Sequence, residues 1–310
     1  MSGQLSADDA ATTADQDFPE VCELELIEGR AAEVGGFAVR RVLPRRPRRT
    51  GGAWCFVDHM GPGRVTDGHG LDIGPHPHIG LQTVTWLLEG AILHRDSLGS
   101  EQVIHPGQLN LMTAGHGVSH SEETTGTHLG GLHGVQLWVA QPSASRDGAA
   151  AFEHHADLPR VELDGGLATV LIGELAGARS AARHDTDHVG AELNLRAGRT
   201  TVPLGRGQEH ALVALTGAVA VGGRRLEPGR LGYLGVERDE VAIDAAEGVR
   251  VLLIGGTPFP EPLLMWWNYV ARTRDEITAA HRQWTAGDER FGRVASPLPR
   301  IDVPGPAWTA

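Results

Sequence analysis

Short apolar runs separated by glycine and proline make up most of this chain from Cys22 onward. Four of them are GGFAVRRVL, GLQTVTWLLEG, GQLNLMTAG and GLHGVQLWVA. Runs of this length, rich in Val, Leu, Thr and Trp and bounded by turn residues, predict β-strands. The 42 glycines and 18 prolines supply the many tight turns that such strands need. The pattern therefore indicates a sandwich or a barrel.

A second stretch of the same kind, residues 167–257, repeats features of the first. LLEGAI at 87–92 followed by HPGQLNLM at 105–112 resembles ALTGAV at 214–219 followed by EPGRLGYL at 227–234. In both halves a strand reaches a glycine turn, returns, and meets a Pro-Gly turn before another strand. Internal repetition of this kind predicts a duplicated β-domain.

These patterns divide the chain into five parts. Residues 1–21 are acidic and poor in apolar side chains, which predicts a disordered N-terminal tail. We assign residues 22–145 to an N-terminal barrel, 146–166 to a linker, and 167–288 to a C-terminal barrel with a terminal helix. Residues 289–310, rich in proline and glycine, are a predicted tail.

The period of the pattern becomes helical near the C-terminus. Thr273 with Glu276 three residues later forms a capping box, which predicts a helix over 273–285. The positions that fall on one face of this helix are Ile277, Ala280, His281 and Trp284. We expect the helix to pack back on the second domain. The preceding MWWNYV segment is a predicted aromatic part of the core.

Composition narrows the functional classes. The formal net charge of −12 argues against a protein that binds nucleic acid directly, because such a protein needs a basic face. No apolar stretch approaches the ~20 residues that a membrane span requires. The two cysteines, Cys22 and Cys55, cannot build a disulfide framework or a four-cysteine zinc site. Together with the absence of a basic and apolar leader, this predicts a cytoplasmic protein.

Histidine is the unusual residue, since ten of the 16 fall within 59–133. HPHIG places His76 and His78 two residues apart, and on a strand such residues point to the same face. GHGVSHSEE gives His120 and Glu122 the same spacing. Two such pairs on neighbouring strands would offer three imidazole nitrogens and one carboxylate oxygen to a single metal ion.

The ligand types suit Fe, Mn, Ni, Cu or Zn. With four protein ligands an octahedral metal keeps two open positions, whereas a tetrahedral zinc would be closed and structural. Gly115 and Gly117 allow the sharp turn that would aim His120. For the other residues of this region a structural role is the stronger expectation: His59 on a loop near the site, Glu123 exposed, and His94, His105, His116, His128 and His133 in the pocket or in turns.

The segment from FVDHMGPG through HPHIGLQTVTWLLEG to AGHGVSHSEE closely resembles the pirin family of bicupins. The resemblance covers most of residues 25–140 and resumes at EPLLMWWNYVARTRDEI. It implies an all-β fold of two tandem cupin (jelly-roll) β-barrel domains with a short C-terminal helix. It also implies one metal ion in the first barrel, with iron as Fe(2+) the first choice. The implied ligands are His76, His78, His120 and Glu122.

Two positions depart from the general cupin pattern. Gln82 stands where the first cupin motif usually has Glu, which should leave the site intact because pirins take their carboxylate from the second motif. In the second half His210 lies near the equivalent turn without a partner histidine. We expect that barrel to hold no metal.

The resemblance implies two alternative functions. Pirin-like proteins resemble quercetin 2,3-dioxygenases, which use dioxygen to open a flavonol ring and release carbon monoxide. A small aromatic substrate would then bind at the metal, and Glu122 would be the general base. The alternative is a non-enzymatic regulator that acts through a protein partner, with the iron as a redox switch. We favour the enzyme.

Overall fold

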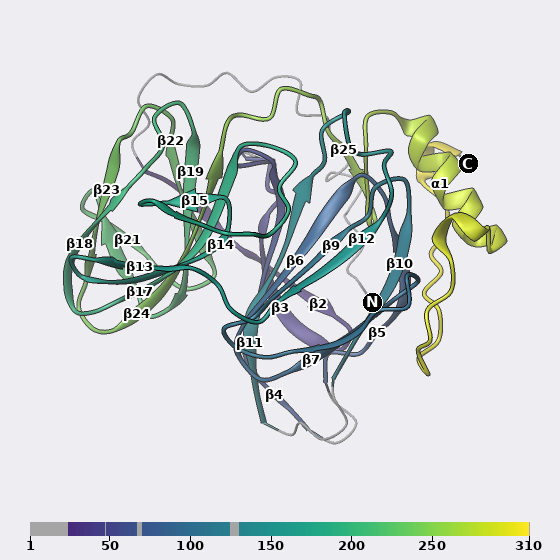
Figure 1. The fold of residues 1–310 in the computed structure, drawn as a ribbon, viewed down its shortest axis with the longest axis horizontal. Helices are drawn as coiled ribbons and strands as arrows, with labels where there is room; N and C mark the ends of the chain where they lie inside the picture. Colours follow the sequence, from purple (N-terminus) through teal and green to yellow (C-terminus); the bar gives the residue numbers. More distant parts are fainter. Residues whose placement is uncertain (1–23, 47, 67–69, 125–129, 310) are drawn as a thin grey trace.

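The computed structural model describes residues 24–46, 48–66, 70–124 and 130–309, which form two β-barrels side by side (Figure 1). Each barrel consists of a seven-stranded sheet and a four-stranded sheet, and the strands named below pair antiparallel. The expected all-β architecture of two tandem barrels is confirmed. The tail expected at 1–21 lies outside the described residues, as do Cys22 and His128.

The first barrel holds the two histidine-containing segments. The strands of its large sheet are, in spatial order, β12 (Ala151–His155), β9 (Leu109–Thr113), β6 (Leu81–Glu89), β11 (Gly130–Ala140), β4 (Trp54–Val65), β3 (Phe37–Leu43) and β2 (Arg30–Val34). The strands of its small sheet are β5 (Ile73–His78), β10 (Val118–Thr124), β7 (Ile92–Asp96) and β8 (Glu101–Ile104).

The second barrel repeats this order. The strands of its large sheet are β1 (Glu25–Glu28), β22 (Arg230–Gly235), β19 (Glu209–Thr216), β24 (Val249–Gly256), β17 (His188–Leu195), β14 (Gly166–Ile172) and β13 (Arg160–Leu163). The strands of its small sheet are β18 (Gly198–Pro203), β23 (Glu240–Ala245), β20 (Val219–Val221) and β21 (Arg224–Leu226). The hairpin β15 (Glu174–Leu175) and β16 (Ala178–Arg179) precedes β17.

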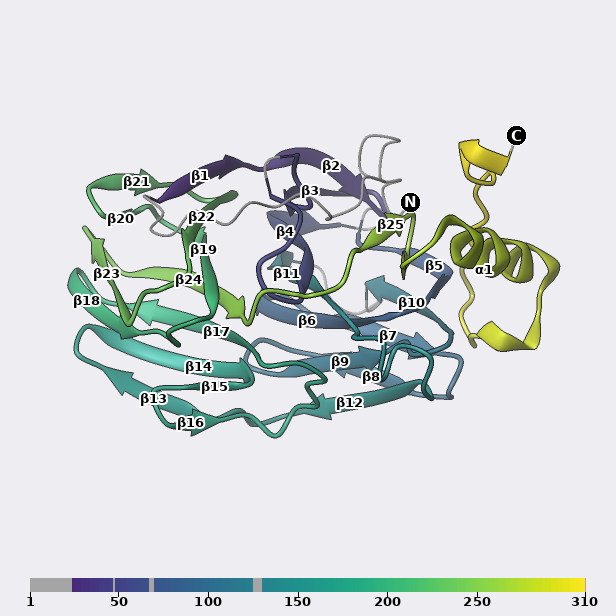
Figure 2. The same cartoon turned by 90° about the horizontal axis from the view of Figure 1, so that it is seen from above.

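The strands of the two barrels correspond one to one. The repeated sequence features therefore fall on matching strands, since β6, β7 and β9 match β19, β20 and β22. The edge strand β1 breaks the order of the chain. It precedes the first barrel but completes the large sheet of the second, whereas β12 follows β11 directly and completes the large sheet of the first (Figure 2). The second barrel is thus completed by a strand from outside its own continuous stretch.

Two of the expected divisions need correction for this reason. Residues 146–166, expected to be a linker, contain β12 and the start of the second barrel, β13. Residues 25–28, assigned to the first barrel, pair with β22 of the second. Each segment contains a short strand that pairs with the edge of a sheet, and the composition of a segment does not reveal such pairing.

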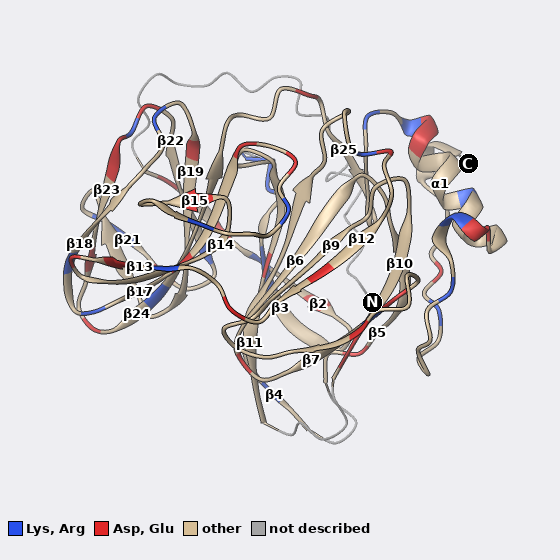
Figure 3. Ribbon diagram, viewed as in Figure 1, with Lys and Arg blue, Asp and Glu red and all other residues tan. Residues whose placement is uncertain are grey.

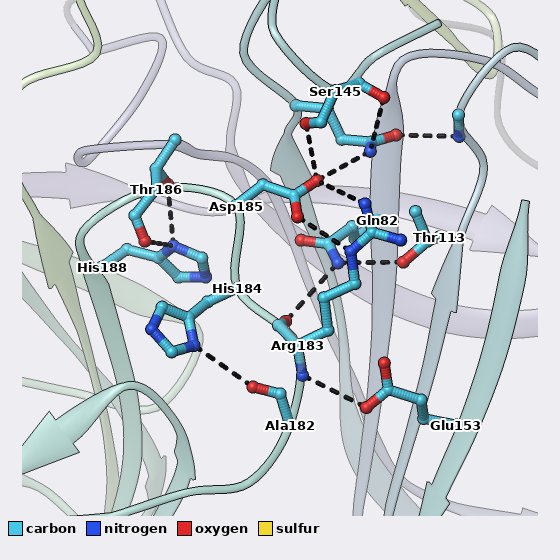
Figure 4. Close-up of polar contacts among 12 residues, drawn as sticks. Gln82, Thr113, Ser145, Glu153, Ala182, Arg183, His184, Asp185, Thr186 and His188 are labelled. Atoms are coloured by element: carbon cyan, nitrogen blue, oxygen red, sulfur yellow. Dashed lines mark hydrogen bonds and ion pairs between the residues drawn. The ribbon is translucent and has the colours of Figure 1, made fainter. Parts of the chain in front are cut away.

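The outer faces of the two large sheets pack against each other in one apolar cluster. Trp54 belongs to this cluster and is fully buried, and its Nε1 donates to the carbonyl oxygens of Val189 (3.0 Å) and Gly255 (3.2 Å) in the second barrel. Polar groups join the barrels beside this cluster (Figure 4). There Asp185 accepts from the Ser145 hydroxyl (2.7 Å), and the Arg183 backbone N–H donates to Glu153 (3.2 Å).

The C-terminal segment returns to the first barrel. It comprises β25 (Leu264–Trp266), β26 (Tyr269–Ala271), α1 (Arg274–Ala286), η2 (Glu289–Phe291) and η3 (Ala307–Thr309). The expected aromatic core segment is largely buried, with Trp267 1% and Tyr269 0% exposed. In Figures 1 and 2 the helix, yellow-green, lies beyond β5 and β10, at the end of the molecule remote from the second barrel.

The helix itself was predicted within one residue of its observed bounds. The Thr273 hydroxyl accepts from the Glu276 backbone N–H (3.2 Å), as the capping box requires. Its docking on the second domain was predicted wrongly, because its buried face packs against β26 and Ile79 of the first barrel. Arg146 also binds Glu276 through two hydrogen bonds of 2.7 and 3.1 Å. The predicted tail likewise packs on this barrel, where the Ile301 N–H donates to Pro75.

Figure 3 shows that basic and acidic residues are interspersed along the ribbons of both barrels. Of the helices in the described ranges, none has the length and hydropathy to cross a membrane.

Candidate metal centre

Two paired strands of the small sheet carry the candidate ligands. In the register of β10 with β5, His120 lies opposite His76, and Val118 lies opposite His78. Residues directly opposite each other on paired strands point to the same face, so the histidines meet inside the barrel. Gly115 precedes this strand with φ +52°, and a Cβ there would collide with the carbonyl of Gly148. The turn that aims His120 therefore requires glycine.

The three imidazoles converge on one point. His76, His78 and His120 each offer a ring nitrogen, and these atoms lie within 4.8 Å of one another. The Nε2 atoms of His78 and His120 are 3.0 Å apart. All three rings are buried, with at most 3% of each residue exposed. Among the described residues this is the one group of three His, Cys, Asp or Glu side chains with ligand atoms so close together.

Burial keeps these rings neutral. Removal from water lowers the pKa of His76 to about 4 and lowers the pKa of His78 and His120 well below the usual 6.5. The charges of neighbouring histidines push the pKa values of His78 and His120 further down. Neutral imidazole is the form that binds a metal through its free lone pair. The donor set therefore fits a divalent ion.

A partner on the far side of each ring fixes which nitrogen faces inward. His76 Nδ1 lies 2.9 Å from the Gly74 carbonyl oxygen, and His78 Nδ1 lies 3.1 Å from that of Asn268. If these Nδ1 atoms carry the protons, each Nε2 lone pair is left for the ion. Such outer partners set the tautomer and the orientation of metal-binding histidines.

The third ring is held by a longer chain. His120 Nδ1 lies 3.4 Å from His94 Nδ1, and His94 Nε2 lies 3.1 Å from Asp96 Oδ2. His94 and Asp96 lie on β7, opposite Glu122 and His120. Protons on His120 Nδ1 and His94 Nε2 make every contact in this chain a donor and acceptor pair. His120 Nε2 then faces the centre.

Glu122 lines the same cavity but lies outside the close group of three nitrogens. The pairing of β10 with β5 advances two residues on β10, from His120 to Glu122, but three on β5, from His76 to Ile73, so the irregularity lies on β5. Burial raises the pKa of Glu122 to about 7, and a hydrogen bond with Thr85 counteracts part of that rise. The Thr85 hydroxyl also lies 2.9 Å from Gln136 Oε1, so its one proton can be donated to either of the two oxygens.

The cavity has an empty volume of about 520 Å³ including its mouth. Apolar side chains form much of its wall: Val34, Val39, Phe56, Met60, Leu71, Ile73 and Trp138. The remaining wall is polar, with Arg41, Asp58, Gln136 and Asn268 beside the histidines and Glu122. Apolar pockets with a few convergent polar groups are typical small-molecule sites.

Several other expectations about this region are corrected. His59 lies on β4 instead of a loop, and its Nε2 is 2.7 Å from that of His133 on β11. Glu123 does point away from Glu122, but it is 6% exposed because Arg95 binds it at 2.6 Å. Gln82 donates to Thr113 (3.0 Å) on the side of the sheet that meets the second barrel (Figure 4).

The remaining candidates are distributed more widely. His105 and His116 are exposed, whereas His94 supports His120. In the second barrel His210 lines an open cavity with His184 and His188. At the inward positions that correspond to His76 and His120, Val202 of β18 lies opposite Val241 of β23. These valines have no ligand atoms, which supports the expectation of a metal-free second barrel.

Sequence reasoning missed three parts of this site. The spacing of His94 and Asp96, again two apart on a strand, was a signal that could have revealed the chain behind His120. The role of Asn268 had no such signal, because its contact with His78 is made by a backbone carbonyl of the C-terminal segment. The polar wall was hidden because its members come from different strands.

Family models match both halves of the chain. The model described as Pirin matches residues 36–139, and that of the Pirin C-terminal cupin domain matches residues 190–292. A protein of Pseudomonas aeruginosa with the name "Putative quercetin 2,3-dioxygenase" is 46% identical, over 96% of this chain and 95% of its own length. Human pirin is 29% identical over 87% of this chain and 94% of its own length.

The chain is also similar to solved structures. A crystal structure of quercetin 2,3-dioxygenase from Acinetobacter baumannii has a TM-score of 0.88 and 45% sequence identity, and covers 91% of this chain and 95% of that one. A bacterial pirin of Escherichia coli in complex with nickel(II) has a TM-score of 0.60 at 17% identity, over 76% of this chain and 100% of its own. At that identity the likeness concerns the fold.

Proposed function

We propose that this chain, which belongs to the pirin family, is a metal-dependent dioxygenase that opens flavonols such as quercetin by 2,3-dioxygenation and releases carbon monoxide. The observation that carries the proposal is a buried triad of neutral histidines facing a largely apolar cavity that also contains a carboxyl group. The names of its relatives support the same reaction.

We further propose that His76, His78, His120 and Glu122 hold one ion, with Fe(2+) as the first choice and Mn, Ni, Cu and Zn as alternatives. Nitrogen and oxygen ligands suit all of these metals. A divalent ion at this position would supply Lewis acidity that lowers the pKa of a coordinated hydroxyl group. Glu122 lines the same cavity but lies outside the close group of three nitrogens, which supports an additional role for its carboxylate.

The chain's own residues would perform three tasks. The three histidines would hold the ion beside Glu122. The carboxylate of Glu122 accepts the proton of the substrate hydroxyl as general base. The apolar wall, which includes Phe56 and Trp138, excludes bulk water from the reacting ring.

Replacement of Glu122 by Gln tests this proposal. The amide keeps an oxygen that can reach a metal but cannot accept the proton, so we expect turnover to fall roughly 10²- to 10⁴-fold. Metal should be retained with reduced affinity. Carbon monoxide release under air and metal analysis of the same preparation measure the two effects.

The matched control is Glu123→Gln, the neighbouring carboxylate that Arg95 binds on the other face. It should leave turnover unchanged. Unchanged turnover in Glu122→Gln would remove Glu122 as the base. If anaerobic addition of a flavonol to the iron-loaded wild type leaves the flavonol absorbance unshifted, the dioxygenase proposal fails and the regulatory alternative with a protein partner is favoured.

A further inference from the structure

A row of six polar side chains crosses the inner face of the first barrel's large sheet. Consecutive strand pairs align these residues directly opposite one another: Arg41, Asp58, Gln136, Thr85, Asn110 and His154. Opposite residues share a face of the sheet, so the six form one continuous band, which we call the polar row. It faces the small sheet that carries the histidine triad.

The polar row interrupts an otherwise apolar interior. Along β4 the inward residues are Phe56, Asp58 and Met60, and the two apolar neighbours belong to different core clusters. Burial of polar groups costs free energy unless they are hydrogen-bonded, so an uninterrupted apolar wall would be the simpler construction. The part of the row that lines the cavity consists of Arg41, Asp58 and Gln136.

Asp58 is held by Arg41 in a two-point contact. Arg41 Nε lies 2.8 Å from Asp58 Oδ1, and Arg41 Nη2 lies 2.7 Å from Oδ2. Both residues are at most 3% exposed, and the guanidinium also lies over the Phe56 ring at 4.5 Å. A carboxylate oxygen has more than one acceptor site, so each oxygen of Asp58 can accept a further hydrogen bond from a ligand.

Gln136 adds a donor beside this acceptor. It lies opposite Asp58 on the neighbouring strand, and it is half-buried where Asp58 is buried. Thr85 engages its Oε1 at 2.9 Å, which fixes the amide and leaves the NH₂ group as the part that a ligand can contact. The wall therefore presents an acceptor and a donor next to each other.

We propose that Asp58 and Gln136, which line the large-sheet wall of the cavity, bind hydroxyl groups of the substrate other than the one that meets the metal centre. They would thereby select planar aromatic substrates that carry additional hydroxyl groups. Arg41 is a positioning residue that holds Asp58 and balances its charge. This inference rests on the proposed function, because it refines the substrate class of the same cavity.

Neutral hydroxyl groups fit this wall better than an anionic group. The positive charge of Arg41 is already matched by Asp58, so a carboxylate on the ligand would meet another carboxylate without a free cation. A phenolic hydroxyl donates to Asp58 and accepts from the Gln136 amide. A site built to bind a hydroxyl rejects an analogue that lacks it, because the buried polar groups are then left unpaired.

The experiment is an anaerobic binding titration of the metal-loaded protein with two flavonols. One is quercetin, whose pendant ring carries hydroxyls, and the other is the flavonol with the same fused rings and an unsubstituted pendant ring. We expect wild type to bind quercetin roughly tenfold more tightly, the size of one buried hydrogen bond left unmade. The readout is the shift in flavonol absorbance.

Two variants locate the effect. In Gln136→Leu, and in the double variant Arg41→Met with Asp58→Leu, the affinity ratio should approach one while the metal content stays at the wild-type level. The double variant removes both charges together, so that no unpaired charge is left inside. The matched control is Asn110→Leu, a member of the polar row outside the cavity lining, which should keep the wild-type ratio.

Each possible outcome supports or overturns the inference or the proposed function. Equal affinities in wild type, or a ratio that persists in the variants, would overturn the inference while turnover of flavonols keeps the proposed function. A ratio that behaves as expected without any turnover would overturn the proposed function and leave the inference standing. If neither flavonol binds wild type, both are wrong. If the double variant does not fold, Gln136→Leu alone decides.

Discussion

The two barrels share one strand order and differ in what fills them. In the second barrel the inner strands β18 and β23 pair Val202 with Val241, and a single apolar cluster occupies the interior. In the first barrel the matching strands β5 and β10 pair His76 with His120. Its apolar residues fall into two clusters, which the polar row and the histidines separate.

This difference shows how a duplicated fold can divide its work. Apolar burial of about 25 cal/mol per Å² is the main stabilising contribution to a β-barrel, and buried polar groups weaken it unless they are paired. The second barrel and the shared outer-face cluster keep that contribution intact. The interior of the first barrel can then hold ligand atoms and a cavity.

The largest expected effect comes from emptying the metal position. His120→Ala removes the ligand at the centre of β10, and we expect the purified protein to lose most of its metal. The matched change in the other barrel, Val241→Ala, should cost roughly 1–3 kcal/mol of stability and leave the metal content unchanged. Elemental analysis and urea unfolding of both variants measure this. Full metal retention in His120→Ala would show the ligand assignment to be wrong.

The next effect is acid sensitivity of the metal-free protein. Burial lowers the pKa of His59, His76, His188 and His210 to about 4 from the usual 6.5. Between these values protons bind the unfolded chain in preference to the folded one, so stability is present above pH 6.5 and is lost as pH falls toward 4. Each such shift corresponds to roughly 3 kcal/mol when burial is complete.

Glu122 acts in the opposite direction in the same protein. Its pKa is raised from 4.5 to about 7, so the folded state holds its proton more tightly in that window and gains stability as pH falls. The histidines outnumber it, and we expect a net loss. Thermal unfolding of metal-free wild type from pH 7 to 4 measures the loss, which should be steeper in Glu122→Gln. Stability that stays flat or rises toward pH 4 would contradict the prediction.

The sequence was informative where the signal is local. His76 with His78, and His120 with Glu122, are each two residues apart on a strand, and that spacing alone puts the members of a pair on one face. The capping box at Thr273 is equally local, and the helix begins at the next residue. The resemblance to pirins placed the histidine pairs on neighbouring strands.

Features set by long-range pairing were not predictable in this way. The strand at 25–28 has no property that assigns it to β22, some two hundred residues away along the chain. The polar row depends on the register of several strand pairs, and Arg41, Asp58 and Gln136 are far apart in sequence. The helix docked on the wrong domain in our expectation because its apolar stripe fits any apolar surface, including that around Ile79.

The smallest expected effect concerns the residues that hold the proposed metal ligand His120 in place from behind. In His94→Phe the new ring retains the stacking on Phe152, where the ring centroids are 4.4 Å apart, but loses the contact to His120 Nδ1. We expect metal affinity to fall roughly 10- to 100-fold, because the His120 ring is no longer fixed in the tautomer that presents Nε2. Competition with a chelator measures the dissociation constant.

A change at Asp96 would be a poorer test of the same chain. Its Oδ1 also accepts from the backbone N–H groups of Leu98 and Ser100, both at 2.9 Å, so its removal would disturb the turn after β7 as well. The control is His105→Phe, an exposed histidine outside the cavity, which should bind metal as wild type does. An unchanged dissociation constant in His94→Phe would mean that β5 and β10 alone hold His120 in place, and that the chain through His94 to Asp96 only fills space.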